Sequence, residues 1–195
     1  MDADQNCLVI DDTQAALNLL ADLNLPDPVI DAEFICRQIE LSPGLRLVPV
    51  EQRHLIELEA TMRFADRIEI RDLNPGVTVS EALLISAETS AWCVTLLDAE
   101  GRVICVGGLG ISQCGNGVPW LLGSDLITKN SFGFLAASRQ LVDQMLVQTG
   151  TLFNCCDRRN FAARRWLSWL GFEFLPDPIG KKPGLALYFH KSWGG

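Results

Sequence analysis

The chain has 195 residues, 48% of them hydrophobic, and a formal charge of −8 at pH 7. This length suits one domain with a short appendage, large enough to bury a substantial core. No apolar run approaches the roughly 18 residues that span a bilayer. The pattern of a secretory signal, a basic start followed by an apolar segment, is not seen either. The negative charge argues against a nucleic-acid surface, because phosphate binding draws its affinity from clustered cations.

Cysteines and histidines argue against a metal site. The seven cysteines, at positions 7, 36, 93, 105, 114, 155 and 156, form no CxxC pair, and His54 and His190 are the two histidines. Structural zinc sites use closely spaced cysteine and histidine pairs, which are missing from this pattern. We therefore expect reduced thiols, no bound metal and a cytoplasmic location.

The first 44 residues differ from the rest of the chain. Asp12 or Thr13 can begin a short helix that passes through Leu20, and Asp31 can begin a second one. The sequence LSPGL at 41–45 indicates a boundary. We predict an N-terminal extension over residues 1–44 and a domain over 45–195.

Regular elements follow from Leu45. The pattern predicts, in chain order, a strand over 45–50, a helix over 51–65, a polar connection over 66–77, a helix over 79–87, and strands over 91–97, 102–111 and 118–127. Thr78 and Glu81 fit a capping box for the second helix. A helix over 131–148, a strand over 151–156, a further helix and strands over 172–175 and 185–190 complete the series. This order predicts an α+β domain with a mixed sheet and helices on both faces.

The stretch DRRNFAARRWLSWLGFEF, residues 157–174, contains the last helix. Asp157 or Asn160 can cap its start, and Gly171 can end it in the left-handed conformation. The residues expected on its buried side are Ala162, Trp166, Trp169 and Leu170. The arginines at 158, 159, 164 and 165 fit either a solvated helix face or a phosphate site.

This stretch and the order of elements resemble the GNAT superfamily of acetyl-CoA-dependent N-acyltransferases. The family pattern reads Asn-x-x-Ala-x-x-hydrophobic-Tyr-x-x-x-Gly-Phe, and the matching residues are Asn160, Ala163, Trp166, Gly171 and Phe172. The resemblance covers residues 45–190 and implies a mixed, mainly antiparallel sheet flanked by helices. GVPWLLGSD (117–125) and FNCCDRRN (153–160) look like the GNAT-like morphogenesis and internal virion proteins of short-tailed bacteriophages and their prophages.

The resemblance implies a place for acetyl-CoA. The family binds the pyrophosphate at a helix start preceded by Gln/Arg-x-x-Gly-x-Gly/Ala, where bare N–H groups and the helix dipole meet phosphate. The aligned residues are Asn130, Ser131, Phe132, Gly133, Phe134 and Leu135, of which Gly133 matches. Leu126 and Ile127 are expected to pair with the pantetheine arm, and Asn160 is assigned to the same site.

The catalytic residues depart from the family pattern. Leu167 stands where many GNAT enzymes carry the tyrosine that protonates the departing thiolate, and the single tyrosine is Tyr188 on the last strand. Asp125 is a candidate general base, with a capping role as its alternative. Cys155 and Cys156 should lie on opposite faces of their strand, so at most one would face a site, and core packing is their expected role.

Two functions follow from this reading. One is a phage-type virion or assembly protein with a degenerate acyl-CoA site. Its partners would be phage structural proteins or a second copy, bound through residues 1–44, Trp169 or Trp193. The other is an active acetyl-CoA-dependent N-acyltransferase that acts on an amine. The fold alone does not separate the two, because unrelated functions share folds.

Overall fold

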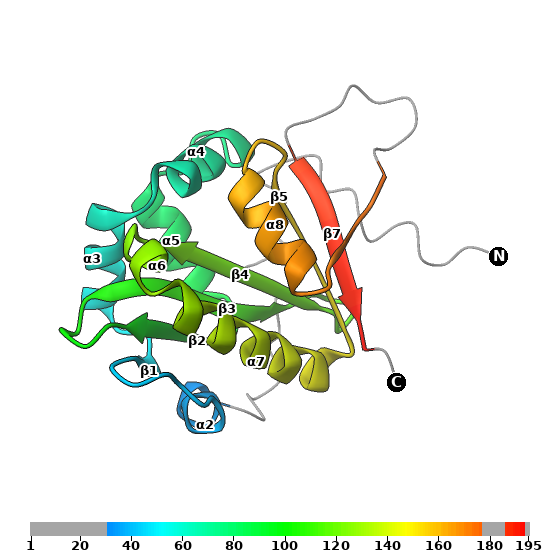
Figure 1. Ribbon diagram of the computed structural model, residues 1–195. Coiled ribbons are helices and arrows are strands. Elements are labelled where there is room, and N and C mark those ends of the chain that lie inside the picture. The colour runs from blue at the N-terminus through cyan, green and yellow to red at the C-terminus, as the bar shows by residue number, and fades with distance from the viewer. Residues whose placement is uncertain (1–30, 177–185, 194–195) are drawn as a thin grey trace.

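The computed structural model describes residues 31–176 and 186–193, and within them seven strands form one sheet in the order β1-β2-β3-β4-β5-β7-β6 (Figure 1). The strands are β1 (Arg46–Pro49), β2 (Ser90–Leu97), β3 (Val103–Ile111), β4 (Gly117–Gly123), β5 (Thr151–Asp157), β6 (Glu173–Phe174) and β7 (Ala186–Ser192). Neighbouring strands are antiparallel except β4 and β5, which are parallel. The predicted α+β class with a mixed, mainly antiparallel sheet is confirmed.

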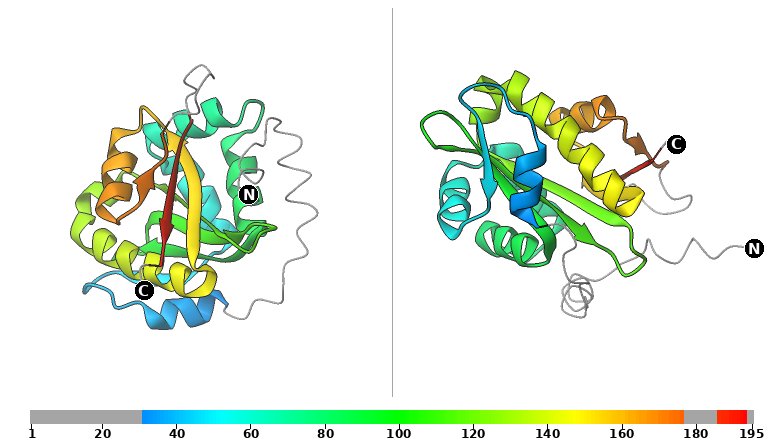
Figure 2. Two further views of the ribbon diagram at one scale, coloured as in Figure 1. Left: turned by 90° about the vertical axis from the view of Figure 1, so that its right-hand side faces the viewer. Right: turned by 90° about the horizontal axis from the view of Figure 1, so that it is seen from below.

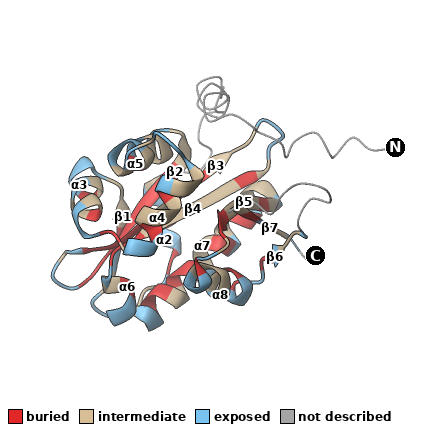
Figure 3. Cartoon of the chain, turned by 90° about the horizontal axis from the view of Figure 1, so that it is seen from above, coloured by how far each residue is buried: buried red, intermediate tan, exposed pale blue. Residues whose placement is uncertain are grey.

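Helices cover both faces of the sheet, as Figure 2 shows with the sheet seen edge-on. They are α2 (Ala32–Gln38), α3 (Gln52–Thr61), α4 (Phe64–Leu73), α5 (Val79–Glu88), α6 (Leu126–Lys129), α7 (Ser131–Thr149) and α8 (Phe161–Trp169). One core cluster joins the sheet to α2, α7 and α8, and a second joins it to α3, α4 and α5. The strands carry more buried residues than the helices do, and the helices turn exposed residues outward (Figure 3).

Several predicted boundaries are confirmed by local hydrogen bonds. Thr78 and Glu81 form the expected capping box at α5, with Glu81 N–H donating to Thr78 Oγ1 at 3.2 Å. Asn160 caps α8 by accepting from Ala163 N–H at 3.1 Å. Gly171 follows α8 with φ +85°, a conformation that favours glycine.

The segment after α3 is a helix, so the prediction of one helix over 51–65 and a polar connection over 66–77 is wrong. The chain breaks at Met62 and Arg63, where Arg63 N–H donates to Gly123 O at 2.9 Å and Met62 bridges to Ser124. It then continues as α4, with Asp66 and Ile70 buried. This tie to the end of β4 is a tertiary contact that local sequence does not signal.

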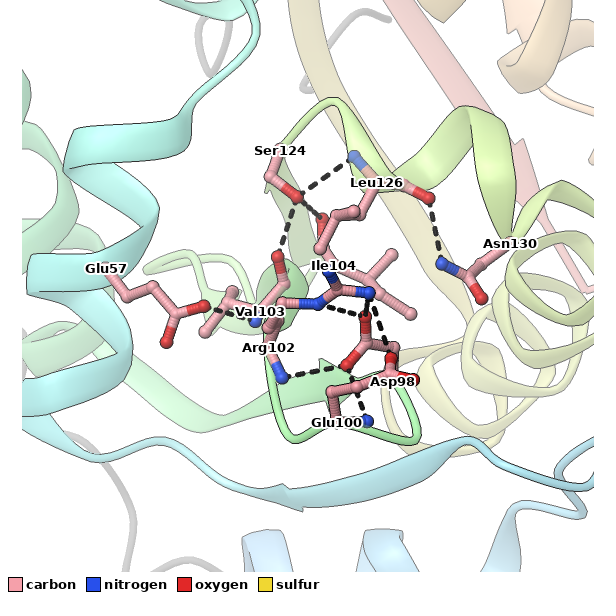
Figure 4. A network of polar contacts seen from close by, with 9 residues as sticks. All are labelled: Glu57, Asp98, Glu100, Arg102, Val103, Ile104, Ser124, Leu126 and Asn130. Carbon is pink, nitrogen blue, oxygen red and sulfur yellow. Dashed lines mark hydrogen bonds and ion pairs between the residues drawn. The ribbon is translucent and has the colours of Figure 1, made fainter.

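The predicted strand over 118–127 is too long. β4 ends at Gly123, and Leu126 and Ile127 belong to α6. Ser124 turns the chain by donating its hydroxyl to Val103 O at 2.6 Å, and Asn130 Nδ2 donates to Leu126 O at 3.0 Å (Figure 4). Side-chain hydrogen bonds therefore fix the connection between β4 and α7 against the hairpin formed by β2 and β3.

The buried stripe of α8 is also shifted from the prediction. Leu167 and Leu170 are buried, whereas Ala162 and Trp169 are exposed. The Trp169 ring lies 4.3 Å from the Arg139 guanidinium carbon, a cation–π contact on the surface. The predicted buried set is wrong at Ala162 and Trp169, because the helix turns its Leu167 edge toward the sheet.

The described part of the N-terminal extension packs on the domain. Asp31 caps α2 as expected, accepting from Phe34 N–H at 2.7 Å, and Ile35 and Ile39 join the main core cluster. The predicted helix at 12–20 lies outside the described residues, as does Cys7. Over 31–176 and 186–193, no helix is long and apolar enough to cross a membrane, and no cluster of three or more metal-ligating side chains occurs.

Candidate active site

The parallel strands β4 and β5 meet at one point and then separate. Their single register pair is Gly117 with Leu152. A Cβ on Gly117 would lie 2.5 Å from Leu152 Cδ2 and 2.7 Å from Thr149 Oγ1, so any other residue here would force these packed side chains to shift. Beyond the pair the two strands run apart (Figure 1). Glycine at this apex therefore sets the origin of a V-shaped opening in the sheet.

A cavity of about 380 Å³ occupies this opening. β4 contributes Trp120, Leu121 and Leu122, and β5 contributes Asn154, Cys155 and Cys156. Helices from both faces complete the wall. Residues from α4 and α5 include Glu69, Ile70 and Ile85, and residues from α7 and α8 include Val142, Met145 and Leu167. The cavity thus reaches both faces of the sheet, and two reactants can meet there from opposite sides.

On the edge of β4 that faces the opening, one residue has a backbone N–H and C=O without hydrogen-bond partners in the described part of the chain. Ser124 N–H donates to Ile104 O on β3 at 2.9 Å, so by alternation Leu121 and Gly123 direct their N–H and C=O groups toward β5. Gly123 is satisfied, because its N–H donates to Asp66 Oδ2 at 2.9 Å and its carbonyl accepts from Arg63 N–H. Among the described residues, no group pairs with the N–H and C=O of Leu121 on this side.

Asn154 bridges the narrow part of the opening. Its Nδ2 donates to Pro119 O on β4 at 2.9 Å, and its Oδ1 accepts from Cys155 N–H on β5 at 2.8 Å. Pro119 has no N–H to satisfy. The amide side chain therefore replaces the missing backbone pairing on both strands and leaves Leu121 as the next available position.

Two carboxylates of α4, three residues apart, close the wide end of the opening. Asp66 takes Gly123 N–H at the end of β4 and pairs with Arg63 at 2.8 Å. Glu69 accepts from Asp157 N–H at the end of β5 and from Asn160 Nδ2 at 2.9 Å. Spacing of i and i+3 puts both on one helix face. Each carboxylate thus caps one of the separating strands.

Of these two carboxylates, Glu69 lines the cavity. Burial raises its pKa, and the negative charges of Asp66 and Asp157 raise it further, against the opposing hydrogen bonds from Asn160 and Asp157 N–H. A carboxylate with a raised pKa that lines a cavity is a candidate to exchange a proton with a ligand. The sequence prediction missed Glu69, because residues 66–77 read as a solvated connection.

The residues expected to carry chemistry differ in their placement. Asp125 is exposed at the start of α6 and does not line the cavity. Leu167 lines it and is buried, so a hydrocarbon occupies that wall. Tyr188 pairs with Cys155 across β5 and β7 and lies outside the cavity wall. No described tyrosine therefore reaches the cavity.

Cys155 and Cys156 both line the cavity, because it passes through the sheet. The expectation that at most one would face a site is therefore wrong. Burial raises the pKa of Cys155 to about 11 and of Cys156 to about 12. Both stay thiols near neutral pH, and a thiol is a poor nucleophile compared with a thiolate. Cys155 and Cys156 therefore form part of the cavity wall and do not act as nucleophiles.

Trp166 adds an unsatisfied donor to the wall formed by α8. Its ring packs 5.6 Å from the Phe134 ring, and its buried indole N–H has no hydrogen-bond partner among the described residues. Trp166 also lines the cavity. A buried donor without an acceptor costs free energy, so a bound carbonyl oxygen here would be stabilising.

The start of α7 offers exposed amides and a covered glycine. Ser131 and Phe132 are exposed, Phe132 at 82%, and within the described residues the N–H groups of 131–133 have no acceptor. Gly133 is buried beneath Ser42 and Leu45, because a Cβ there would lie 2.3 Å from Leu45 Cδ1 and 3.4 Å from Ser42 Cβ.

The other residues that the resemblance assigned to the cofactor lie in the core, on α6, or in hydrogen bonds that hold elements together. Phe134 is buried in the core and Leu135 packs against it. Leu126 and Ile127 lie on α6 rather than along a strand edge, and Asn130 holds α6. Asn160 is buried, and it caps α8 while holding Glu69.

Comparisons with solved structures show the fold. The chain superposes on a GNAT-family acetyltransferase from Bacillus anthracis with a TM-score of 0.57 and 8% identity, covering 79% of this chain and 97% of that one. A GCN5-related N-acetyltransferase from Kribbella flavida gives 0.54 and 14%, covering 78% and 100%. The ribosomal-protein-S5-alanine acetyltransferase from Vibrio fischeri gives 0.54 and 11%, covering 78% and 95%.

No protein-family model and no curated protein sequence matches this chain. At these identities the superpositions show the fold alone. The chain therefore has the fold of GNAT acetyltransferases, and the chemistry must be argued from its own cavity.

Proposed function

We propose that the protein is an acyl-CoA-dependent N-acyltransferase whose transfer step takes place in the cavity between β4 and β5. The observation that carries this proposal is the unused peptide of Leu121, which faces a cavity open to both faces of the sheet. An amide-containing arm can pair with this peptide as an added strand edge would. The acceptor amine then approaches from the side of α4 and α5.

The chain's own groups fit an acyl-CoA along this path. Leu121 offers one donor and one acceptor to the arm, and the orphan indole N–H of Trp166 suits a carbonyl oxygen. The exposed amides of Ser131 and Phe132 suit phosphate at the positive end of the α7 dipole. When bound, acyl-CoA supplies an activated thioester carbonyl. Leu167 cannot protonate the leaving sulfur, so that proton comes from water.

Calorimetric titration with acetyl-CoA tests the proposal, with Leu121→Pro and Leu121→Ala as a matched pair. Proline removes the N–H that faces the opening and leaves the bonds to β3 intact, as Pro119 already does two residues earlier on β4. Alanine keeps the N–H. We expect wild type and Leu121→Ala to bind, and Leu121→Pro to bind about tenfold more weakly. If wild-type protein gives no heat of binding at millimolar acetyl-CoA, the proposal that it is an acyltransferase is rejected.

The second candidate is a phage-type virion or assembly protein with a degenerate acyl-CoA site. The cover of Leu45 over Gly133 and the hydrocarbon of Leu167 favour it. Large hydrophobic side chains also stand exposed around α7 and α8, namely Phe132, Phe161 and Trp169. Such residues suit a second copy of the chain or another structural protein as partner. Under this proposal acetyl-CoA gives no heat, and Trp169→Ser reduces self-association in analytical ultracentrifugation.

A further inference from the structure

The part of the cavity wall formed by α4, α5 and the connection between them is apolar apart from a few groups. It includes Ile70, Leu73, Val77, Ala82 and Ile85. Among the described residues that line the cavity, Glu69 is the one acid, and no lysine, arginine or histidine joins it. A ligand on this side therefore meets mostly hydrocarbon, the neutral polar side chains of Asn74 and Ser86, and one carboxylate.

Glu69 lacks a cationic partner among the described residues. Asp66 has Arg63 at 2.8 Å and Asp157 has Arg159 at 2.5 Å, whereas no described ion pair includes Glu69. Its two hydrogen bonds come from neutral donors, Asn160 Nδ2 and Asp157 N–H. A carboxylate offers about four acceptor positions, so two remain for a ligand. A half-buried charge without a counter-ion has a desolvation cost, and a cationic ligand would reduce that cost.

We propose that the acceptor is a primary amine on an apolar body, with its ammonium group held by Glu69 and its body against α4 and α5. This inference rests on the proposed acyl transfer and names its acceptor class. Polyamines and other highly charged acceptors fit poorly, because their further charges would meet no second carboxylate on a wall that is mostly hydrocarbon.

Glu69 also has a chemical role in this scheme. It takes one proton from the ammonium, and the freed nitrogen lone pair attacks the thioester carbonyl carbon to form the C–N bond. The C–S bond breaks and its electron pair leaves on sulfur. The second nitrogen proton passes to water, and the thiolate gains its proton from water. Glu69 then releases its proton to solvent and is ready for another turnover. The products are the amide, the free thiol and this one proton.

Binding of amines without any acyl donor tests the inference directly. We expect hexylamine to bind more tightly than spermidine in calorimetry at pH 7.5. Glu69→Gln keeps an acceptor oxygen for Asn160 but loses the charge, and should weaken hexylamine binding about tenfold or more. Glu88→Gln, at an exposed residue of α5, is the matched control and should bind as wild type does. Far-UV circular dichroism verifies that each variant folds.

A second variant tests the apolar body. Ala82→Leu fills part of the wall, and should shift the preferred amine from hexylamine toward propylamine. With acetyl-CoA present, Glu69→Gln should lower the rate of free-thiol release by about 100-fold or more, as for loss of a general base, at unchanged acetyl-CoA affinity.

The outcomes separate the two proposals. Tighter spermidine than hexylamine binding, or equal hexylamine binding by wild type and Glu69→Gln, overturns the acceptor inference even where acetyl-CoA binds. Failure of acetyl-CoA to bind overturns the proposed function, and the amine titration still decides whether Glu69 forms an ammonium site.

Discussion

Asn160 holds two parts of the molecule together through one short side chain. Its Oδ1 caps α8, and its Nδ2 donates to Glu69 on α4. We expect Asn160→Ala to lower the free energy of unfolding by about 1–3 kcal/mol, from the lost cap and the lost bond to a carboxylate. Urea denaturation measures this loss.

Serine at the same position is the matched control. Asn160→Ser keeps an oxygen for the Ala163 N–H but cannot reach Glu69 in the same way, so its loss should be smaller. Equal stability of wild type and Asn160→Ala would show that neither contact stabilises the fold. Asn160 matches the asparagine of the GNAT motif in sequence position. In the structure its side chain caps α8 and holds Glu69.

His54 should make stability depend on pH. It is fully buried, its Nδ1 accepts from Glu51 N–H at 3.1 Å and lies 3.1 Å from Thr95 Oγ1, and its Nε2 has no described partner. Burial lowers its pKa, and Arg53 lowers it further, against the opposing effect of Glu51 and Glu57. In the unfolded chain it takes a proton near pH 6.5, and in the fold it takes one only at a lower pH. The free energy of unfolding therefore falls as pH drops below about 6.5.

Urea denaturation at pH 7.5 and 5.5 measures this effect by difference. His54→Asn keeps an acceptor near Nδ1 and cannot take a proton, so its stability should fall less between the two pH values than that of wild type. One proton accounts for at most about 1.4 kcal/mol per pH unit. Identical slopes for wild type and His54→Asn would refute this assignment.

At the scale of elements, the meeting point of β4 and β5 depends on Gly117. Gly117→Ala would bring a methyl group against Leu152, Thr149 and Leu109, at 2.5, 2.7 and 2.9 Å. We expect a loss of about 1–3 kcal/mol in unfolding free energy, as for overpacking of a dense core. Gly110→Ala on β3 is the control, because its nearest new contact is 3.6 Å from Val118 Cβ. Similar thermal midpoints for the two variants would contradict the tight apex.

Sequence reasoning predicted elements whose boundaries are made by nearby residues. The capping box of Thr78 and Glu81, the Asn160 cap and the glycine after α8 all act within a few positions, and all are confirmed. α4 was missed because Asp66 and Glu69 look like solvated residues. Their partners, Gly123, Asp157 and Asn160, are distant in the chain.

The candidate site was less predictable than the fold for the same reason. The resemblance indicated the helix start at Ser131–Leu135, which the structure places at α7. The Asn154 bridge and the free peptide of Leu121 depend on how two strands separate. Such a separation leaves no periodic signal in either strand. The local sequence pattern therefore predicts the order of helices and strands. The opening between β4 and β5 is found only in the three-dimensional structure.

At the scale of the whole molecule, α2 belongs to the main core even though it precedes the predicted boundary at residue 44. Ile35 is 0% exposed and Ile39 is 7% exposed, and both join the cluster that contains α7 and α8. Burial of one such side chain stabilises a fold by about 1.5–3 kcal/mol. A chain that begins at residue 45 loses both.

We therefore expect a chain of residues 45–195 to be less stable than one of residues 31–195 by about 3–6 kcal/mol, or not to fold. This loss is at least about a fifth of the roughly 5–15 kcal/mol that stabilises a typical domain. Urea midpoints of the two chains measure it. In the whole chain, Ile35→Ala should reproduce part of the loss and Phe34→Ala, at an exposed residue of the same helix, should cost little. Equal midpoints for the two truncated chains would place the boundary at residue 44 after all, with α2 contributing nothing to the core that it contacts.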